Sequence, residues 1–558
     1  MPTITISKDD LCQLVGRKLS QQDLLDVLVL SKIVHEETLG DEMTLEICSD
    51  RPDLLSAEGI AREICGLLEI ETGLKQYKVT KSDISLKVDR SVKLIRPHIV
   101  SALVEGVVLS DLMIRQLMQL QEKLHLGYGR NRRKVSVGIH DIDKVNHSLV
   151  YAGIRPEKIC FTPLGETRPM NGKEILQQNA KGKEYRHIIE SYPRYPLLFD
   201  SNGEVLSLPP IINGVTTTVN EHTKNLLLDV TGTDPKLVRF VLNMMAANLA
   251  DRGATIKSVR VTDGGIVQYT PDLSPSISKL NVGNACDLLG LELKPKQVAA
   301  LLRKMRYGIK SMRGDVLLVQ VPAYRSDILH EVDLIEDVAI GYGIAALDPE
   351  MPFTPTIGHN LDITGYSTIV RDIMIGCGFQ EIVNFVLTNP TALFDRMNRQ
   401  PEKIVEIANP VARDYSVLRN NLLPGLMDFL SYNKHVPYPQ KVFECGDTVT
   451  VCENTPTRTL NRRKLAAAIS NHVASYEDIQ SVLYSLLKYL KVTGWSIAPA
   501  VDPSFIDGRC AEIFLGSSRI GVLGEINPSV LLEFGLENPV AGLEIDLQAC
   551  MDEDPYRR

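Results

Sequence analysis

Apolar positions recur with a helical period in residues 322–343, which read PAYRSDILHEVDLIEDVAIGYG. The steps between them are four, three and four residues, so they form one stripe along a helix, and that stripe is expected to be buried. The residues of the stripe are Ile328, Val332, Ile335 and Ala339. This stretch therefore predicts an amphipathic helix with one face in a protein core.

The opposite face of the predicted helix is acidic. Asp333, Glu336 and Asp337 stand at i, i+3 and i+4, and Asp327 precedes them where its carboxylate can cap the helix. No Lys or Arg at i+4 relieves their repulsion, which costs about 0.2–0.5 kcal/mol per pair. The spacing leaves two explanations open. One is a solvated acidic face, or one that meets an Arg-rich surface on another chain, which is the commoner case; the other is a hard divalent cation such as Mg²⁺.

Both strand-like and helical patterns fill the rest of the chain. Residues 1–86 open with an alternating strand and continue with amphipathic helices, whereas residues 91–270 read mainly as strands between polar turns. Helices are expected at 110–126 and 234–249, the latter with Asp234 as its cap and Pro235 in its first turn. The fold class predicted is a multidomain protein of α/β and α+β type.

Composition places the chain among globular proteins. Its 558 residues favour three or four domains, and 44% hydrophobic residues are ample for buried cores. The formal charge of −8 argues against a surface coated in basic residues, so any contact with nucleic acid must come from local clusters. The ten cysteines form no C-x-x-C pair and no zinc-like cluster with histidine. No signal peptide and no apolar run of about 18 residues is found, so a cytoplasmic location without membrane contact is expected.

Polar residues end an apolar strand at 229–234, which reads DVTGTD. Sheet proteins often place ligand groups at such a position, although a turn with two helix caps explains the pattern about as well. No Ser/His/Asp or Cys/His set has a recognisable spacing, so a covalent nucleophile is not supported. His140 and Asp141 are neighbours on a strand and are expected to point to opposite faces, so they are interpreted as structural.

A basic turn lies upstream of this strand. It consists of Arg130, Arg132, Arg133 and Lys134, with Tyr128 nearby. Such a turn is more often simply solvated, but it is a candidate contact for the phosphates of a nucleic acid.

The acidic helix resembles a motif of the phenylalanine–tRNA ligase beta-subunit family. The pattern R-x-D-I-x-x-E-x-D-L-x-E-D/E-x-A-x-x-Y-G is carried here by Arg325, Asp327, Ile328, Glu331, Asp333, Leu334, Glu336, Asp337, Ala339, Tyr342 and Gly343. The resemblance implies that Asp327, Asp333, Glu336 and Asp337 bind Mg²⁺ shared with an alpha subunit, and it favours the metal explanation. Residues 49–63, SDRPDLLSAEGIARE, are similar to another run of the family.

The same motif has a weak echo inside the chain. Residues 51–55, RPDLL, line up with residues 325–329, RSDIL. Gly59 and Arg62 then occupy the positions of Asp333 and Glu336, so the first copy lacks the cluster of oxygens that a cation needs. A metal is expected on the later helix only.

Residues 209–213 and 229–234 resemble the editing domain of archaeal and eukaryotic family members, which hydrolyses Tyr mistakenly attached to tRNA(Phe). The resemblance implies a pocket formed by Leu198, Ser207, Asp229 and Thr231, and a role for the basic turn at the tRNA 3′ end. A pocket that hydrogen-bonds a phenol rejects Phe, because the missing hydroxyl leaves buried polar groups unpaired. Water, positioned by the protein, is expected to attack the ester.

Residues 416–430, 440–449 and 521–547 resemble the family's catalytic-like domain, a relative of the class II synthetase fold. A class II site neutralises phosphate charge with one Arg in an F-R-x-E motif and another after a final Gly-rich strand. Here Phe443 is followed by Glu444, and Glu544 and Asp546 stand where the second Arg is expected. This domain is therefore expected to act as scaffold and subunit interface, without activating an amino acid.

The resemblance covers nearly the whole chain and implies four domains. They are an N-terminal mixed α/β module (1–86), an α/β tRNA-editing domain (87–270), a winged-helix-like domain with the Mg²⁺-binding helix (271–347) and a non-catalytic class II synthetase-like antiparallel-sheet domain (348–558). With an alpha subunit, in a two-alpha, two-beta tetramer, this chain would serve the ATP-dependent attachment of phenylalanine to tRNA(Phe). Two alternatives remain: a free-standing deacylase of mischarged tRNA, and a non-catalytic RNA-binding assembly protein.

Overall fold

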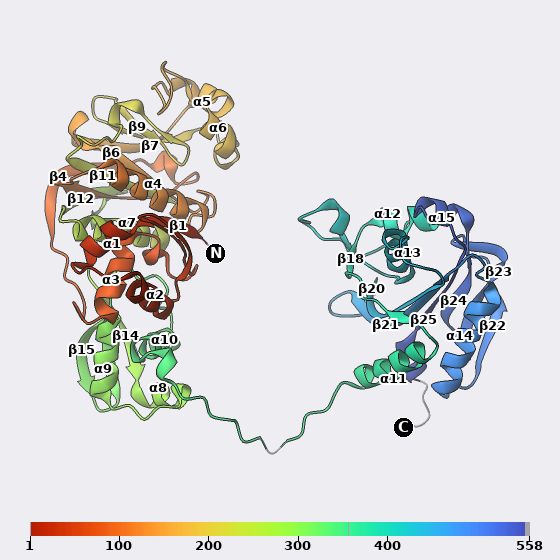
Figure 1. Cartoon of the computed structure of the whole chain (residues 1–558). Helices are drawn as coiled ribbons and strands as arrows, with labels where there is room; N and C mark the ends of the chain where they lie inside the picture. Colours follow the sequence, from red (N-terminus) through yellow and green to blue (C-terminus); the bar gives the residue numbers. More distant parts are fainter. Residues whose placement is uncertain (1, 355, 553–558) are drawn as a thin grey trace. The chain divides into compact units, whose positions relative to one another are not determined.

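The computed structural model describes residues 2–354 and 356–552 of the chain. They form two compact units, Met1–Met351 and Pro352–Arg558, each with its own sheets and cores (Figure 1). Sixteen α-helices and twenty-five strands in five sheets are found in the described ranges. The predicted multidomain class with mixed helices and sheets is confirmed.

The first unit opens with a small module of three strands and three α-helices. Its antiparallel sheet has the order β1-β3-β2. The Ser20 hydroxyl begins the second helix by accepting a hydrogen bond from the Asp23 backbone N–H, and the Asp23 carboxylate accepts one from the Ser20 backbone N–H, which is a capping box. The elements are β1 (Thr3–Ser7), α1 (Lys8–Val15), α2 (Gln21–Leu30), β2 (Val34–Leu39), β3 (Glu42–Glu46), η1 (Pro52–Leu54) and α3 (Ala57–Leu67).

A ten-stranded sheet forms the centre of the first unit. Its order is β10-β9-β8-β7-β4-β12-β5-β11-β6, with β13 added beside β12, and β4 runs parallel to both β12 and β7. The strands are β4 (Val79–Val88), β5 (His98–Glu105), β6 (Val135–Asp141), β7 (Ser148–Ile154), β8 (Tyr195–Asp200), β9 (Val205–Leu208), β10 (Ile212–Asn213), β11 (Asn225–Gly232), β12 (Thr255–Asp263) and β13 (Ile266–Thr270). Strand β4 crosses position 86, the predicted end of the N-terminal module, and belongs to this sheet.

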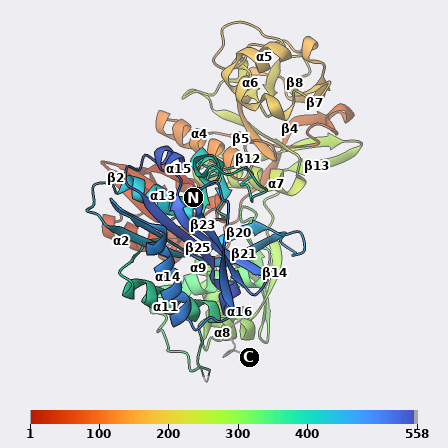
Figure 2. The ribbon, with the colours of Figure 1, turned by 90° about the vertical axis from the view of Figure 1, so that its right-hand side faces the viewer.

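Helices cover the sheet at two places. The long helices α4 (Asp111–Leu126) and α7 (Pro235–Asp251) begin at the caps Ser110 and Asp234, close to the predicted bounds. Their apolar residues share one core with the N-terminal module and with Leu226, Leu228 and Val230 of β11, whereas Leu227 enters a second core on the other face. The short helices α5 (Gly172–Gln178) and α6 (Ala180–Tyr185) gather near β7 and β8 (Figure 2). The apolar run of β11 reflects this burial on both faces.

The first unit ends with a second small module that repeats the topology of the first. Its order β14-α8-α9-β15-β16-α10 and its sheet β14-β16-β15 match β1-α1-α2-β2-β3-α3 and β1-β3-β2. The weak sequence echo therefore corresponds to two modules of one topology. The elements are β14 (Ser276–Asn281), α8 (Val282–Leu289), α9 (Pro295–Lys304), β15 (Gly308–Arg313), β16 (Val316–Val321), α10 (Glu331–Tyr342) and η7 (Ile344–Ala346).

The second unit is built on a seven-stranded sheet of order β17-β20-β21-β25-β24-β23-β22. All its pairs are antiparallel except β17 with β20, and separate apolar cores pack on its two faces. Its strands are β17 (Gln380–Glu381), β20 (Gln440–Val451), β21 (Thr459–Ser470), β22 (Trp495–Pro499), β23 (Phe505–Leu515), β24 (Ser518–Ile526) and β25 (Val540–Asp546). The strands β18 (Leu387–Thr388) and β19 (Val417–Leu418) form a separate antiparallel pair. The helices are α11 (Asp362–Gly376), α12 (Pro390–Leu393), α13 (Leu423–Tyr432), α14 (Tyr476–Tyr489), α15 (Pro528–Glu533) and α16 (Leu547–Asp552).

Within the described ranges, none of the helices has both the length and the apolar character that crossing a bilayer requires.

Candidate functional site

The acidic helix begins later than its sequence pattern predicts. Helix α10 starts at Glu331, and the Asp333 carboxylate accepts hydrogen bonds from the backbone N–H groups of Leu329 and His330, both at 2.7 Å. Asp327 was predicted to cap this helix, and that prediction is wrong, because its carboxylate pairs with a neighbouring guanidinium instead. Val332, predicted to be buried, is 51% exposed.

A buried guanidinium, that of Arg325, joins two of the four predicted metal ligands. It donates to both oxygens of Asp327 at 2.8 and 2.6 Å and to Asp337 Oδ2 at 2.7 Å. Tyr307 also donates its hydroxyl to Asp337. Burial acts to lower the pKa of Arg325, but Asp337, Tyr307 and Asp327 outweigh it and hold that pKa above its ordinary value. Arg325 thus already supplies the positive charge that these two carboxylates need.

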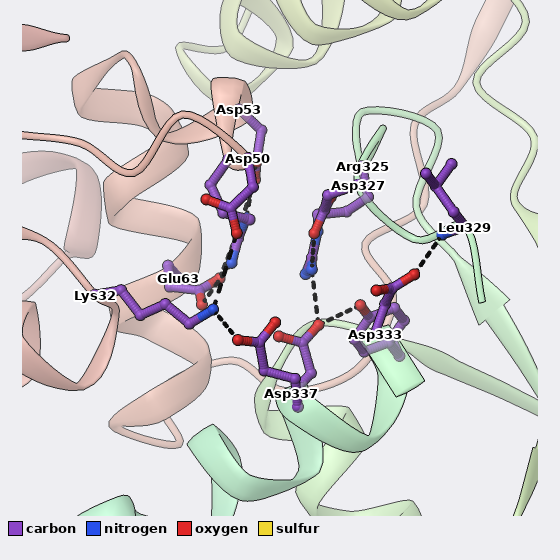
Figure 3. Close-up of polar contacts among 12 residues, drawn as sticks. Lys32, Asp50, Asp53, Glu63, Arg325, Asp327, Leu329, Asp333 and Asp337 are labelled. Atoms are coloured by element: carbon purple, nitrogen blue, oxygen red, sulfur yellow. Dashed lines mark hydrogen bonds and ion pairs between the residues drawn. The ribbon is translucent and has the colours of Figure 1, made fainter. Parts of the chain in front are cut away.

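The first module contains the same arrangement. Arg51 donates to both oxygens of Asp53 at 2.9 Å, and to the Glu63 carboxylate at 3.1 and 3.3 Å. In both modules the carboxylates follow the arginine by two and by twelve residues. Figure 3 shows Asp53 and Glu63 of the first module opposite Asp327 and Asp337 of the second. Sequence comparison aligned the two arginines, and Asp53 with Asp327, but did not reveal that an arginine holds each set together.

The other two predicted metal ligands lie apart from this buried cluster. Asp333 serves the start of α10, and the Glu336 carboxylate, 54% exposed, forms an ion pair with Lys32 of the first module. Lys32 also lies 3.9 Å from Asp50 (Figure 3). No group of three or more acidic, His or Cys side chains that could hold a metal is found among the described residues. The four carboxylates therefore do not fit one Mg²⁺ site in this arrangement.

The second candidate site is a cavity of about 250 Å³ lined by both edges of the ten-stranded sheet, β6 at one edge and β9 and β10 at the other. Ligand pockets commonly measure about 300–1,000 Å³, so this cavity has the size for one amino-acid side chain rather than a nucleotide. Its walls come from α4, β6, the loop between β9 and β10, and β11. The lining residues are Met118, Gln121, Glu122, His125, Arg132, Ser136, Val137, Gly138, Leu164, Lys181, Ser207, Pro209, Pro210, Ile211, Ile212, Asn213 and Asp229.

Strand register places a carboxylate in this cavity. Asp229 on β11 lies opposite Gly138 on β6. A Cβ atom on Gly138 would come within 2.0 Å of Asp229 Oδ2 and 2.7 Å of His140 Nε2, so only glycine leaves room for both groups. Asp229 is 2% exposed and needs a partner for its buried oxygens.

That partner is His140, which sequence reasoning interpreted as structural. His140 and Asp141 do point to opposite faces, since Asp141 contacts Thr223 and Lys144. However, His140 Nε2 lies 2.8 Å from Asp229 Oδ2, and its Nδ1 lies 2.8 Å from Thr217 Oγ1. A histidine two residues beyond the glycine shares its face, which is the signal that could have linked it to Asp229.

Thr231 lies behind the cavity wall. Its hydroxyl accepts from Arg96 Nε at 2.8 Å and lies 3.0 Å from Ser136 Oγ. Arg96 is 2% exposed and donates only to hydroxyl and carbonyl oxygens among the residues described, and burial lowers its pKa to about 10. The predicted residue Thr231 therefore helps to hold a buried cation beneath Ser136.

Ser207 and Leu198 face each other on strands β9 and β8. Ser207 lines the cavity and is 2% exposed, and its hydroxyl has no hydrogen-bond partner within the described ranges. Leu198 is fully buried in the core behind it. A buried hydroxyl without a partner, on a residue that lines a cavity, indicates a place where a ligand can supply the missing bond.

The basic turn divides into one buried and several outer residues. Arg132 is 7% exposed, lines the cavity and lies over the Tyr185 ring at 4.3 Å. Arg130 and Arg133 are exposed, and Lys134 is partly buried. Arg130, Asn131 and Arg132 all have positive φ, from 48° to 64°. Such a run of non-glycine residues is costly, and it is typical of functional loops.

The seven-stranded sheet carries two buried acids where a nucleotide-binding enzyme would have arginines. Glu444 and Glu544 lie in one row of the sheet, with Ala466 between them. Arg419 Nη1 lies 2.7 Å from Glu444 Oε1, and Lys464 Nζ lies 2.8 Å from Glu544 Oε1. Burial acts to raise the pKa of Glu544, but Lys464 and the Leu423 N–H outweigh it and lower that pKa.

A cavity of about 570 Å³ lies beside Glu544. Three cations line it, and each already has a carboxylate partner: Arg399 with Asp502, Lys464 with Glu544 and Arg519 with Glu512. A phosphate group entering this cavity would meet paired cations and further acids rather than free guanidinium groups.

Comparisons with known proteins agree along nearly the full length. Residues 347–547 match the family described as "Phenylalanyl tRNA synthetase beta chain CLM domain", residues 278–344 the "tRNA synthetase B5 domain" and residues 105–261 the "B3/4 domain". The chain is 40% identical over 555 residues to the phenylalanine–tRNA ligase beta subunit of Archaeoglobus fulgidus, covering 99% of each chain. It is also 40% identical over 555 residues to that of Pyrococcus furiosus, covering 98% of this chain and 99% of the other.

A solved structure is similar as well. It is an N-terminal fragment of the phenylalanyl-tRNA synthetase beta subunit from Pyrococcus horikoshii, 42% identical, with a TM-score of 0.59. The match covers 61% of this chain and 100% of that one.

Proposed function

Because the chain belongs to the phenylalanine–tRNA ligase beta-subunit family, we propose that it works beside an alpha subunit in a two-alpha, two-beta tetramer and removes mischarged tyrosine from tRNA(Phe). The holoenzyme attaches phenylalanine to tRNA(Phe) with ATP. Formation of the adenylate and transfer to tRNA take place on the alpha subunit. Family membership favours this assignment over a free-standing deacylase or an RNA-binding assembly protein.

The division of labour is supported by the second unit. Glu444 and Glu544 are buried in one row of the sheet, each paired with its own cation. Phosphoryl and adenylyl chemistry needs positive groups aimed at developing negative charge, and carboxylates at these positions oppose it. We interpret residues 348–558 as a class II-like scaffold and subunit interface.

The editing role rests on one observation, the cavity whose inner end holds Asp229 and the Ser207 hydroxyl, which has no hydrogen-bond partner among the residues that the structure describes. A tyrosine phenol entering there would donate to Asp229 and exchange a hydrogen bond with Ser207. Phenylalanine would leave both groups unsatisfied, which disfavours its binding strongly. Leu198 and Thr231 lie behind the pocket. Leu198 pairs with Ser207 across strands β8 and β9, and the Thr231 hydroxyl accepts a hydrogen bond from Arg96.

The chemical step is hydrolysis of the aminoacyl ester. A water oxygen attacks the carbonyl carbon, the bond from that carbon to the ribose oxygen breaks, the ribose oxygen takes up one proton of the water, and the other proton is released to solvent. The products are free tyrosine, with its carboxylate, and tRNA(Phe) with its terminal hydroxyl restored. The exposed residues Arg130 and Arg133 lie on the turn that leads into the cavity, where phosphates of the tRNA 3′ end can be held.

The contacts of the acidic residues in and before α10 leave two of them, rather than four, as proposed Mg²⁺ ligands. Asp327 and Asp337 are held by buried Arg325, whereas the Glu336 carboxylate faces solvent beside Lys32. We propose that Asp333 and Glu336 contact the ion, with water and the alpha subunit completing its ligands, and that Asp327 and Asp337 stabilise the helix that carries them. When bound, the ion would supply charge neutralisation at the subunit boundary.

The four-domain division, with bounds 1–86, 87–270, 271–347 and 348–558, remains part of the proposal. Its winged-helix-like third domain has the strand and helix order of the N-terminal module, which suggests that one fold was used twice.

Co-expression with the alpha subunit tests the proposed function. The complex should have the mass of the tetramer, charge tRNA(Phe) with phenylalanine and release tyrosine from Tyr-tRNA(Phe). Asp229→Ala should leave phenylalanine charging near normal while Tyr-tRNA(Phe) accumulates. Glu157→Gln, an exposed substitution outside the cavity, is the matched control. Deacylation that persists unchanged in the Asp229 variant would remove this cavity from the reaction.

A further inference from the structure

We propose that the ion pair of Glu122 and Arg132 binds the α-amino ester end of the editing substrate, with Glu122 accepting from the α-ammonium group and Arg132 donating to the ester carbonyl. This inference rests on the proposed editing function and assigns it a substrate contact distinct from the phenol-binding residues. Neither residue belongs to the set that sequence resemblance indicated for the pocket.

The difference in exposure between the two ends of the cavity indicates which way round the substrate binds. Asp229 and Ser207 are each 2% exposed and lie at the closed end of the cavity, whereas the Glu122 side chain is 41% exposed. The ester of an aminoacyl-tRNA continues into the nucleic acid, so it must lie at the open end. The tyrosine ring must then point inward to Asp229, and the α-amino group comes to the mouth, where Glu122 is.

Glu122 is held ready to accept a cation. Its Oε1 accepts from Arg132 Nη2 at 2.7 Å and lies 3.3 Å from His125 Nδ1. His125 Nε2 accepts from the Val137 backbone at 2.8 Å, so the proton of the neutral ring lies on Nδ1 and is donated to Glu122. No hydrogen bond to Oε2 is found in the described part of the chain, which leaves that oxygen available.

The charge state of the group agrees with this role. The hydrogen bond from His125, together with the positive charge of Arg132, outweighs burial and lowers the pKa of Glu122 to about 2. Glu122 is therefore a carboxylate at neutral pH, and the α-ammonium group of an aminoacyl ester is a suitable partner.

Arg132 is fixed in place by its surroundings. Its Nη1 donates to the carbonyl oxygens of Pro210 and Ile211 at 3.2 and 3.0 Å, and its guanidinium lies over the Tyr185 ring. Its Nε is buried without a hydrogen-bond partner among the residues described. An unpaired buried donor of this kind can be satisfied by a carbonyl oxygen, and its bond strengthens as negative charge develops on that oxygen.

The pair matches the substrate's own arrangement of charge. An α-amino ester carries a cation and a carbonyl oxygen on adjacent carbon atoms, and the cavity offers an anion and a donor already in contact. The other cation of the lining, Lys181, has its own partner, Glu184, at 3.1 Å. Glu122 can therefore accept a hydrogen bond from Arg132 through Oε1 and another from the α-ammonium group of the substrate through Oε2.

The competing explanation is that Glu122 only positions Arg132. The two roles differ in their response to the substrate's charge. If Glu122 binds the α-ammonium group, acetylating that nitrogen removes the interaction, and Glu122→Gln then costs little further. If Glu122 is only a positioning residue, its substitution affects charged and acetylated substrates alike.

The test measures kcat/KM for deacylation of Tyr-tRNA(Phe) and of N-acetyl-Tyr-tRNA(Phe) by the complex with the alpha subunit. A hydrogen bond to a charged group contributes enough that the unmodified substrate should be favoured about 10- to 100-fold by the natural protein. In Glu122→Gln the ratio of kcat/KM for the unmodified substrate to that for the acetylated one should fall to about 2 or less, mainly through a higher KM for Tyr-tRNA(Phe). The comparison has the form of a double-mutant cycle, with one change in the protein and one in the substrate. Glu157→Gln should keep the natural ratio.

Failure of this inference is separable from failure of editing itself. Equal rates on the two substrates by the natural protein, or an unchanged ratio in Glu122→Gln, would overturn the role of Glu122 while editing stands. Arg132→Lys should lower kcat at least about tenfold on both substrates, and an unchanged kcat would remove Arg132 from the site. If the natural complex hydrolyses neither substrate, the proposed editing function is what fails.

Discussion

Arg325 and Arg51 occupy equivalent positions in two modules of one topology, and each joins a carboxylate two residues on with another twelve residues on. The first module has Gly59 and Arg62 where the second has Asp333 and Glu336. The first module therefore has the arginine cluster without acids at the positions of Asp333 and Glu336. It shows that the cluster does not depend on those two acids. We infer that the cluster stabilises the loop before each module's last helix, and that Asp333 and Glu336, which lie outside the cluster, are the acids of α10 available for another role.

Loss of one member of either cluster should destabilise the protein. Asp337→Asn leaves Arg325 with one carboxylate, and Glu63→Gln does the same to Arg51. Breaking a buried ion pair typically costs about 3–5 kcal/mol, because a buried charge is left without its partner. Glu336→Gln should cost less than about 1 kcal/mol, since its pair with Lys32 is half exposed. Urea unfolding of the three variants checks this order, and equal losses would contradict it.

Metal binding should depend on Asp333 and Glu336 rather than on the arginine-bound carboxylates of Asp327 and Asp337. The double variant Asp333→Asn/Glu336→Gln should lose Mg²⁺, or Mn²⁺ in its place, from the complex with the alpha subunit, because two of the proposed ligands are gone. Titration of the complex with Mn²⁺, followed by electron paramagnetic resonance, measures the loss. Glu157→Gln, an exposed substitution away from α10, is the control and should leave metal content unchanged. Retention of the ion by the double variant would show that α10 does not hold it.

A methyl group at Gly138 should abolish editing selectively. Its Cβ would lie 2.0 Å from Asp229 Oδ2 and force the Asp229–His140 pair apart. Gly138→Ala is therefore expected to charge phenylalanine normally and to accumulate Tyr-tRNA(Phe) in a misacylation assay. Gly365→Ala, where a Cβ has nothing within 4 Å, is the matched control. Normal removal of tyrosine by Gly138→Ala would mean that this cavity is not the editing pocket.

The separately purified chain should show no ATP–pyrophosphate exchange with phenylalanine. Glu444 and Glu544 present negative charge where phosphate would lie, and the nearby cations are already paired. Isothermal titration with ATP should likewise give no saturable binding to residues 352–558 within the full chain. Robust exchange without the alpha subunit would defeat the proposed division of labour.

Acid should weaken the Glu122 contacts in a defined pH window. The pKa of Glu122 falls from 4.5 to about 2 on folding. A carboxyl group with a lowered folded-state pKa adds stability that is complete above its unfolded value and is lost as pH falls toward the folded one. Between pH 4.5 and 2 the natural protein should therefore lose more thermal stability than Glu122→Gln, by an amount reduced by solvent exposure. Melting temperatures of both proteins across that range measure the difference, and parallel curves would contradict it.

Local sequence was sufficient wherever the deciding interactions lie within a few residues. Helices α4 and α7 begin at the predicted caps, Ser110 and Asp234, because a cap acts on backbone groups two or three positions away. The placement of Glu444 and Glu544 at the two positions where arginines are expected was also readable from motif spacing. The prediction for Asp327 failed because a guanidinium two residues before it competes with the helix end, and spacing does not show which contact is stronger.

Tertiary structure alone decided which distant groups meet. Strand pairing brings His140 to Asp229, module packing brings Lys32 to Glu336, and the turn at Arg132 brings its guanidinium to Glu122. The sequence by itself determined the family, the elements and the kinds of chemistry available. Whether an acid binds a metal, holds an arginine or faces a substrate depends on the charge nearest to it in space, and that neighbour is chosen by the packing of elements far apart in the chain.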